Sequence, residues 1–126
     1  MKKFIPMLLS SLFLSSCSSA QNHPTYRQVS MDEAVNIMQS EEGYIILDVR
    51  RAYEYADGHI PGAINVPNES IGESEIRDLP DKNQLILVYC RSGRRSKEAA
   101  EKLVKLGYTN VVEFGGISDW KGEIEK

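Results

Sequence analysis

The sequence is poor in the residues that build disulfide or metal scaffolds. Its 126 residues include two cysteines, Cys17 and Cys90, and two histidines, His23 and His59. Two cysteines are too few for a disulfide framework, and the histidines have no neighbouring ligands at zinc-site spacing. We therefore expect neither a disulfide-stapled fold nor a metal site, and no motif indicates a cofactor.

The sequence also lacks an excess of positive charge. There are 15 Lys and Arg residues against 18 Asp and Glu, for a formal net charge of −3. Because basic residues neither dominate nor form a long stripe, the charge pattern argues against a nucleic-acid partner. A hydrophobic content of 41% and a charged content of 26% describe one ordinary globular domain.

No apolar segment is long enough to be an obvious membrane span. The apolar stretch at residues 4–14 is interrupted by serines and Pro6. It has about half of the roughly 20 residues that a membrane-spanning helix needs. With Lys2 and Lys3 before it and small residues after it, residues 1–16 have the layout of a secretory signal.

The end of that segment, Leu14-Ser15-Ser16-Cys17, resembles a bacterial lipobox, in which the cysteine is lipidated and becomes the first mature residue. A plain signal peptide and a real membrane anchor are the alternatives. The resemblance implies a lipid-anchored protein of the bacterial cell envelope. If the organism is Gram-negative, Ser18 after the cysteine favours the outer membrane, on its periplasmic side. We expect three parts: a signal peptide at 1–16, a lipidated N-terminus and tether at 17–25, and a folded domain at 26–126.

Short apolar segments alternate with amphipathic ones along the expected domain. Apolar, β-branched composition predicts strands at 26–29, 44–47, 63–66, 85–89 and 110–114. Helices are expected after Ser30, which with Glu33 forms a capping box, and from Ser96 onward. Gly43 is expected to end the first of these helices. Shorter helical segments are expected at 51–56, at 73–79 and, after Gly115-Gly116, in a last segment that bears Trp120. Such alternation predicts an α/β fold with a mainly parallel sheet covered on both faces.

The stretch Leu85–Ser96, LILVYCRSGRRS, carries the clearest chemical signal. It places Cys90 where a buried strand stops, in a tight loop ahead of a helix N-terminus. Unpaired N–H groups at that terminus and three arginines within five residues favour an anion there. Both effects favour the thiolate, which is the nucleophilic form of cysteine. The alternative is an inert cysteine buried at a strand end. The surrounding glycine and arginines favour the nucleophile.

The loop CRSGRRS resembles the active-site loop of single-domain rhodaneses, the thiosulfate sulfurtransferases. Two further segments agree: LDVR with Glu54-Tyr55 and GHIPGAINVP, and the C-terminal GYTNVVEFGG leading to Trp120. The resemblance spans residues 26–121 and implies a five-stranded rhodanese sheet. It also implies a small anionic sulfur donor and a thiol or cyanide acceptor, with transfer through a Cys90 persulfide. We expect a monomer.

The resemblance assigns the substrate contacts to the loop after Cys90: Arg91, Ser92, Gly93, Arg94, Arg95 and Ser96. Guanidinium groups suit the oxygens of a sulfonate, and Arg91 and Arg94 are the expected substrate-facing side chains, although one of them is expected to be only solvated surface charge. Arg95 is expected to pair with Glu54 or Asp48. Asp48, Arg50, Glu54 and His59 are interpreted as supporting residues, and Asp48 either holds the loop or caps the next helix.

His59 is a candidate general base, but its Gly-Pro turn favours a histidine held by a backbone hydrogen bond. Other functions for the loop stay open. They are a cysteine-dependent phosphatase or arsenate reductase, a non-catalytic sulfur- or partner-binding module, and a redox or peroxide-scavenging thiol. Cysteine phosphatases of this fold resemble one another in a C-x5-R loop. Here Arg95 gives C-x4-R, Ser96 occupies the position of the phosphatase arginine, and Tyr89 stands where many tyrosine phosphatases carry His.

Overall fold

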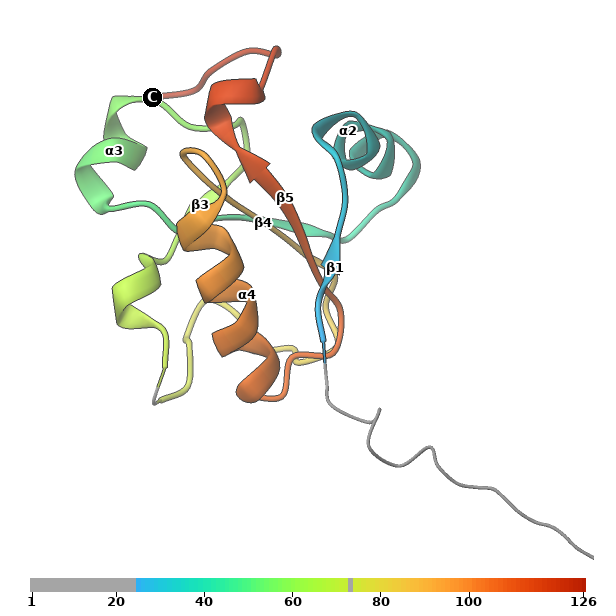
Figure 1. The fold of residues 1–126 in the computed structure, drawn as a ribbon, viewed down its shortest axis with the longest axis vertical. Coiled ribbons are helices and arrows are strands. Elements are labelled where there is room, and N and C mark those ends of the chain that lie inside the picture. The colour runs from blue at the N-terminus through green and yellow to red at the C-terminus, as the bar shows by residue number, and fades with distance from the viewer. Residues whose placement is uncertain (1–24, 73) are drawn as a thin grey trace, which may run out of the picture.

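A computed structural model describes residues 25–72 and 74–126, which form a parallel sheet with helices on both faces (Figure 1). Five strands, in the order β1-β5-β4-β2-β3, are paired in parallel throughout. This confirms the predicted α/β class and the five-stranded sheet. Cys17 and the proposed signal lie outside the described residues. The strands are β1 (Arg27–Gln28), β2 (Ile45–Asp48), β3 (Ile64–Asn65), β4 (Ile86–Cys90) and β5 (Val111–Gly116).

In the described part of the chain, four helices lie in the connections between these strands and a fifth follows β5. Three of the five are α-helices: α2 (Met31–Ser40), α3 (Ala52–Asp57) and α4 (Arg94–Lys105). Two are short 3₁₀ helices: η4 (Asn68–Ser70) and η5 (Ile117–Asp119). No helix in the described part of the chain combines the length and apolar character that crossing a bilayer requires.

Two apolar clusters cover the two faces of the sheet. On one face, the buried α4 residues Ala99, Ala100 and Leu103 pack against strand residues that include Val88 and Val111. On the other, Ala34 of α2 packs with Leu87, Tyr89, Val112 and Phe114. Figure 1 shows α4 and α2 on opposite sides of the sheet. Side chains that alternate along β4 and β5 therefore enter one cluster or the other, and both faces are covered.

Several element boundaries differ from the sequence-based expectations. Helix α4 begins at Arg94 and not at Ser96, so two of the three loop arginines belong to its first turn. Helix α2 ends at Ser40, before Gly43. The helical turn expected at 73–79 is wrong, because described residues 74–79 form bends and turns and the 3₁₀ turn lies earlier, at Asn68–Ser70.

The N-terminus of α2 is capped as expected in one respect. The backbone N–H of Glu33 donates to the Ser30 hydroxyl at 3.1 Å, which satisfies one of the free donors of the first turn.

The sheet brings the carboxyl ends of β2 and β4 side by side. Asp48 pairs with Tyr89 in the register of these strands, and Cys90 follows at the next position. In open parallel sheets, ligands bind beyond the carboxyl ends of the strands. The fold therefore places Cys90 at the edge where such a site is expected.

Candidate active site

Cys90 is the last residue of β4, and its free thiol is almost wholly buried. The backbone N–H of Gly93 donates to the Cys90 sulfur at 3.0 Å. Gly93 has a φ of 118°, a left-handed conformation that favours glycine, and it immediately precedes α4. The chain thus turns tightly around the sulfur, and the free N–H groups at the start of α4 point toward it.

Burial alone would raise the pKa of the Cys90 thiol. Hydrogen bonds from the Ser96 hydroxyl and from the backbone N–H groups of Ser96, Gly93 and Ser92 outweigh it, and the pKa lies below the ordinary thiol value. The low pKa is thus explained by donors of the loop and the first helical turn. Sequence reasoning had given the arginines equal weight.

Residues 90–96 are called the Cys90 loop. The end of β5 and the residues that follow it hold this loop in place. Cys90 is paired with Gly116 after an irregularity in the β4–β5 ladder. A Cβ atom at Gly116 would overlap the carbonyl group of Arg91 and the nitrogen of Ser92. The N–H of Ser118 donates to the same Arg91 carbonyl at 3.2 Å. Gly116 is therefore required so that the loop can lie directly on β5.

Arg95 forms a two-pronged ion pair with Glu54 of α3, at 2.7 and 3.1 Å. Both side chains are largely buried, with 19% and 14% of their surface exposed. The Arg95 hydrogen bond, opposed by burial and aided by the Arg51 N–H, lowers the pKa of Glu54 to about 2. Of the two partners expected for Arg95, the structure brings Glu54 to it. The pair ties the Cys90 loop to α3.

Two clefts open beside this loop. The smaller, of about 290 Å³, is lined by Cys90 and by residues that include Arg91, Arg94 and Arg95. The larger, of about 670 Å³, is lined by residues that include Arg91, Tyr53 and Ile117. Arg91, Tyr53 and Glu54 line both clefts. Arg94 is exposed and forms a surface ion pair with Glu98 at 3.2 Å. A small anion reaching the Cys90 sulfur would meet guanidinium groups on its way.

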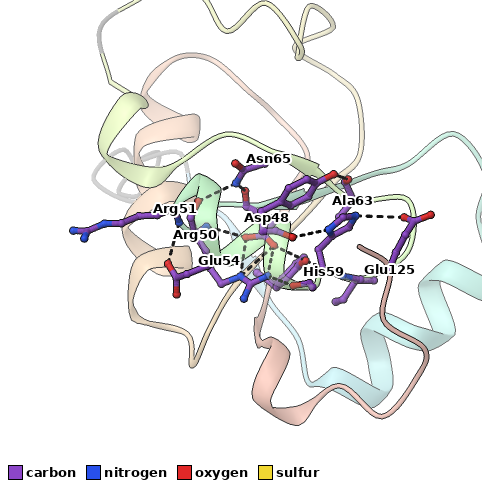
Figure 2. A network of polar contacts seen from close by, with 12 residues as sticks. Asp48, Arg50, Arg51, Glu54, His59, Ala63, Asn65 and Glu125 are labelled. Atoms are coloured by element: carbon purple, nitrogen blue, oxygen red, sulfur yellow. Dashed lines mark hydrogen bonds and ion pairs between the residues drawn. The ribbon is translucent and has the colours of Figure 1, made fainter.

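Asp48 does not pair with Arg95 and does not cap α3 through its side chain. It accepts hydrogen bonds from the Arg50 backbone and guanidinium at 2.8–3.2 Å and from the Tyr89 hydroxyl at 2.7 Å (Figure 2). The Arg50 guanidinium also donates to the Gly58 carbonyl at 2.7 Å. The expectations that Asp48 pairs with Arg95 and that it caps the next helix were wrong, and its contacts fit the supporting role. Together with Arg50, Tyr89 and the Gly58 carbonyl, it forms a closed network, called here the Asp48 network.

His59 is held away from catalytic use by its neighbours. Its Nδ1 lies 2.8 Å from the Tyr55 carbonyl, and its ring stacks on Tyr55 with centroids 3.7 Å apart. Nε2 lies 3.4 Å from a Glu125 carboxylate oxygen, and residues 59 and 125 form an antiparallel bridge (Figure 2). These contacts fit a histidine that fastens the C-terminal segment to the domain, in agreement with the backbone-bonded alternative.

Sequence reasoning missed Glu113. This β5 residue is 2% exposed, and its carboxylate accepts hydrogen bonds from the Ser96 hydroxyl at 2.5 Å and the Gly115 N–H at 2.9 Å. A signal was available. Glu113 lies inside the last apolar strand of a sheet expected to be covered on both faces, so its side chain had to be buried.

Within residues 25–72 and 74–126, His, Cys, Asp and Glu side chains nowhere gather in a group of three that could hold a metal ion. The polar groups around Cys90 are instead N–H, hydroxyl and guanidinium donors. These donors are suited to an anion.

Comparison with known proteins gives consistent matches. The family profile of the rhodanese-like domain matches residues 30–123. The thiosulfate sulfurtransferase PspE of Escherichia coli K12 is 42% identical over 73 residues, which are 58% of this chain and 70% of that protein. The putative sulfur carrier protein YrkF of Bacillus subtilis is 36% identical over 109 residues. That match covers 85% of this chain but only 57% of the relative.

Among solved structures, a rhodanese with anions from E. coli superposes with a TM-score of 0.60 at 38% sequence identity. The match covers 66% of this chain and 98% of the other. The agreement extends to the whole of that smaller protein.

Proposed function

Because the chain belongs to the rhodanese-like domain family of sulfurtransferases, we propose that it transfers a sulfane sulfur from a thiosulfate-like donor to a thiophilic acceptor through a Cys90 persulfide. The observation that carries this proposal is the position of the Cys90 sulfur. It lies at a strand end, accepts the Gly93 N–H at 3.0 Å, and has a lowered pKa. A lowered pKa favours the thiolate, which is the nucleophilic form of cysteine.

The reaction has two steps. The Cys90 thiolate attacks the outer sulfur of thiosulfate, the S–S bond of the donor breaks, and sulfite leaves with the bonding electron pair. A persulfide remains on Cys90. Cyanide or a thiolate acceptor then attacks the outer persulfide sulfur, and the Cys90 thiolate is the leaving group. The enzyme returns to its starting form without an external oxidant or reductant.

The Cys90 loop supplies what each step needs. N–H groups of Ser92, Gly93 and Ser96 lie where they stabilise negative charge on sulfur, first on the thiolate and then on the persulfide. Arg91 and Arg94 line the cleft beside Cys90 and can meet the sulfonate oxygens of the donor. The larger adjoining cleft shares Arg91 with the cleft that contains Cys90 and offers space for an acceptor beside it.

The same geometry favours sulfur over phosphate. Arg95 closes a loop of the form C-x4-R, and its guanidinium is engaged by Glu54. The position of the phosphatase arginine is filled by Ser96, whose side chain is wholly buried. A cradle one residue shorter leaves less room for a tetrahedral phosphate. Misplaced oxyanion donors cost about 3 kcal/mol each in the transition state.

The test is a paired assay on one preparation. We expect thiosulfate-dependent formation of thiocyanate from cyanide and negligible hydrolysis of an aryl phosphate. Cys90→Ser should abolish sulfur transfer and leave the circular dichroism spectrum unchanged. Efficient phosphate hydrolysis without sulfur transfer from any donor would show that the phosphatase alternative is correct.

The N-terminal segment supports a second part of the proposal. We propose that residues 1–16 are removed and that Cys17 carries lipid, so that 17–25 tether the domain to the cell envelope as a monomer. Mass spectrometry of the native protein should find an acylated N-terminal Cys17. Cys17→Ser should change localisation and leave sulfur transfer intact. An unmodified terminus at another residue would contradict the lipobox.

A further inference from the structure

A buried polar pair lies directly beneath the Cys90 loop. The Ser96 side chain is wholly inaccessible and Glu113 is 2% exposed. The Ser96 hydroxyl donates to a Glu113 carboxylate oxygen at 2.5 Å, and the same oxygen accepts the Gly115 N–H at 2.9 Å. The pair joins the first turn of α4 to β5, close to the sulfur.

Burying the Glu113 carboxylate among apolar side chains costs free energy, which suggests that the residue has a specific role there. Side chains alternate along β5, so Glu113 points to the same face as Val111, which belongs to the apolar cluster under α4. An isolated ionised carboxylate in such a place is strongly disfavoured. Among the described residues, no lysine or arginine forms an ion pair with it, and the Ser96 and Gly115 donors satisfy one of its oxygens.

Ser96 has a single hydroxyl proton and several acceptors. The Glu113 oxygen is at 2.5 Å, the Gly93 carbonyl at 2.9 Å and the Gly115 carbonyl at 3.4 Å. The Ser96 hydroxyl also contributes to the lowered pKa of the Cys90 thiol, so the sulfur competes for the same proton. A hydroxyl can give its proton to only one of them at full strength. The carboxylate of Glu113, at the shortest distance, is the strongest competitor.

We propose that Glu113 is a positioning residue that acts on Cys90 through Ser96, because its carboxylate competes with the Cys90 sulfur for the Ser96 hydroxyl proton and weakens the hydrogen bond from Ser96 to the sulfur. The inference rests on the proposed function only in taking Cys90 as the nucleophile. Ser96 donates mainly to the Glu113 carboxylate, which is its nearest acceptor at 2.5 Å. When the side chain at position 113 instead donates to the Ser96 oxygen, the Ser96 proton becomes available to the thiolate. Apart from ionisation of the Cys90 thiol, whose proton passes to solvent, no covalent bond is made or broken.

This action of Glu113 explains how a thiolate can stay reactive in a loop that contains many hydrogen-bond donors. Each hydrogen bond to the sulfur stabilises the thiolate but reduces its nucleophilicity, because reactivity falls as the thiol pKa falls. The best attacking thiol has a pKa near the ambient pH. By weakening the hydrogen bond from Ser96 and placing negative charge nearby, Glu113 counteracts the other N–H groups.

Other charged groups also face this pair. From α4, Arg95 interacts electrostatically with Cys90, although its guanidinium is engaged by Glu54 of α3. The Lys97 ammonium lies near Gly93, on the same side as the Glu113 carboxylate. Next to β1, burial and the charges of Glu101 and Glu113 raise the pKa of Tyr26. The experiment must therefore separate an effect through Ser96 from a general effect of charge.

The test is the pH dependence of Cys90 alkylation by iodoacetamide in the full chain, resolved by peptide mass spectrometry so that Cys17 does not interfere. Glu113→Gln removes the charge; its amide oxygen can accept the Gly115 N–H while its amide N–H donates to the Ser96 oxygen, which frees the Ser96 proton for the sulfur. We expect the midpoint of alkylation to fall by about one pH unit, the size of one hydrogen bond to a charged sulfur. Above both midpoints, alkylation should be about threefold slower in the variant, because the thiolate is less nucleophilic.

The same substitution is then made in the Ser96→Ala variant. There, Glu113→Gln should shift the midpoint of alkylation by less than half of the shift that it causes in the wild-type chain, because the mediating hydroxyl is gone. Glu101→Gln, the same change of charge at an exposed site of α4, is the control and should leave the profile unchanged. An unchanged or raised midpoint in Glu113→Gln, or a shift of half or more that persists without Ser96, would overturn the proposal. Because alkylation needs no sulfur donor, the result stands even if no sulfur transfer is found.

Discussion

Two buried carboxylates near the carboxyl end of the sheet are held in different ways. Asp48 is wholly buried and is bound by the Arg50 guanidinium and the Tyr89 hydroxyl. Glu113 is equally inaccessible but is bound by a hydroxyl and a backbone N–H. The first lies in a closed network of the domain frame, and the second lies under the nucleophile.

The difference teaches which buried acid can take part in chemistry. In the Asp48 network, a guanidinium neutralises the carboxylate, and burial together with the Asp48 charge raises the pKa of Tyr89. Each proton of the Asp48 network is therefore held by one defined acceptor. The proton between Ser96 and Glu113 has alternative acceptors, one of which is the Cys90 sulfur. The Asp48 network thus serves the fold, and the Ser96–Glu113 pair serves the reactive loop. The Glu54–Arg95 ion pair connects the two regions.

Asp48→Asn should have the largest effect on stability. It leaves the buried Arg50 guanidinium without a counter-charge, and breaking a buried ion pair in this way costs about 3–5 kcal/mol. Sulfur transfer per folded molecule should change little. Glu113→Gln is the matched variant at the other buried acid, and we expect it to cost less than about 1.5 kcal/mol because both of its hydrogen bonds can be replaced. Urea unfolding of the two variants measures the contrast, and equal losses would contradict it.

Gly116→Ala should reduce activity strongly and stability only moderately, in contrast to Asp48→Asn. The new methyl group would overlap the Arg91 carbonyl, so the Cys90 loop must move off β5. We expect a stability loss of about 1–3 kcal/mol, as for other overpacked sites. Displaced loop donors should also lower kcat/KM by a factor of about 100. Gly72→Ala is the control, because no other atom would lie within 4 Å of its new methyl group. A fully active Gly116→Ala variant would show that the loop does not depend on this contact.

Breaking the connection between the regions should have a smaller, pH-dependent effect. The pKa of Glu54 is lowered to about 2, so its ion pair stabilises the fold above the ordinary pKa of 4.5 and is lost as the pH falls toward 2. Glu54→Gln should therefore be less stable than the wild type by about 2 kcal/mol at neutral pH. The difference should disappear between pH 4.5 and 2, as measured by denaturant unfolding across that range. A difference that persists at pH 2 would exclude the ion pair as its cause.

The sequence was sufficient for the frame of this fold because buried parallel strands carry a strong signal. The apolar segments ending at Asp48 and Cys90 are β-branched and short, and both are strands in the sheet. The start of α4 was misplaced because apolar periodicity begins only at Ala99. Nothing in the side chains of Arg94 and Arg95 marks the first turn, which begins after a glycine with no side-chain cap.

The pairing of charged residues was less predictable. Sequence could offer Arg95 two acidic partners, but only the packing of α3 against the loop selects Glu54. Asp48 binds the guanidinium two residues away, a local contact that competes with capping. The last strand was expected to end at residue 114, so Gly116 was placed outside it and its need to be glycine was missed, since its close approach to Arg91 depends on the β4–β5 register.

The most direct test of the Cys90 mechanism is to trap its intermediate. The full chain is incubated with thiosulfate, freed of excess donor, and examined by peptide mass spectrometry before and after addition of cyanide. We predict a gain of one sulfur atom on the peptide that contains Cys90, and its loss with cyanide as one equivalent of thiocyanate forms. Turnover of thiosulfate without added sulfur on Cys90, or in the Cys90→Ser variant, would contradict the persulfide mechanism.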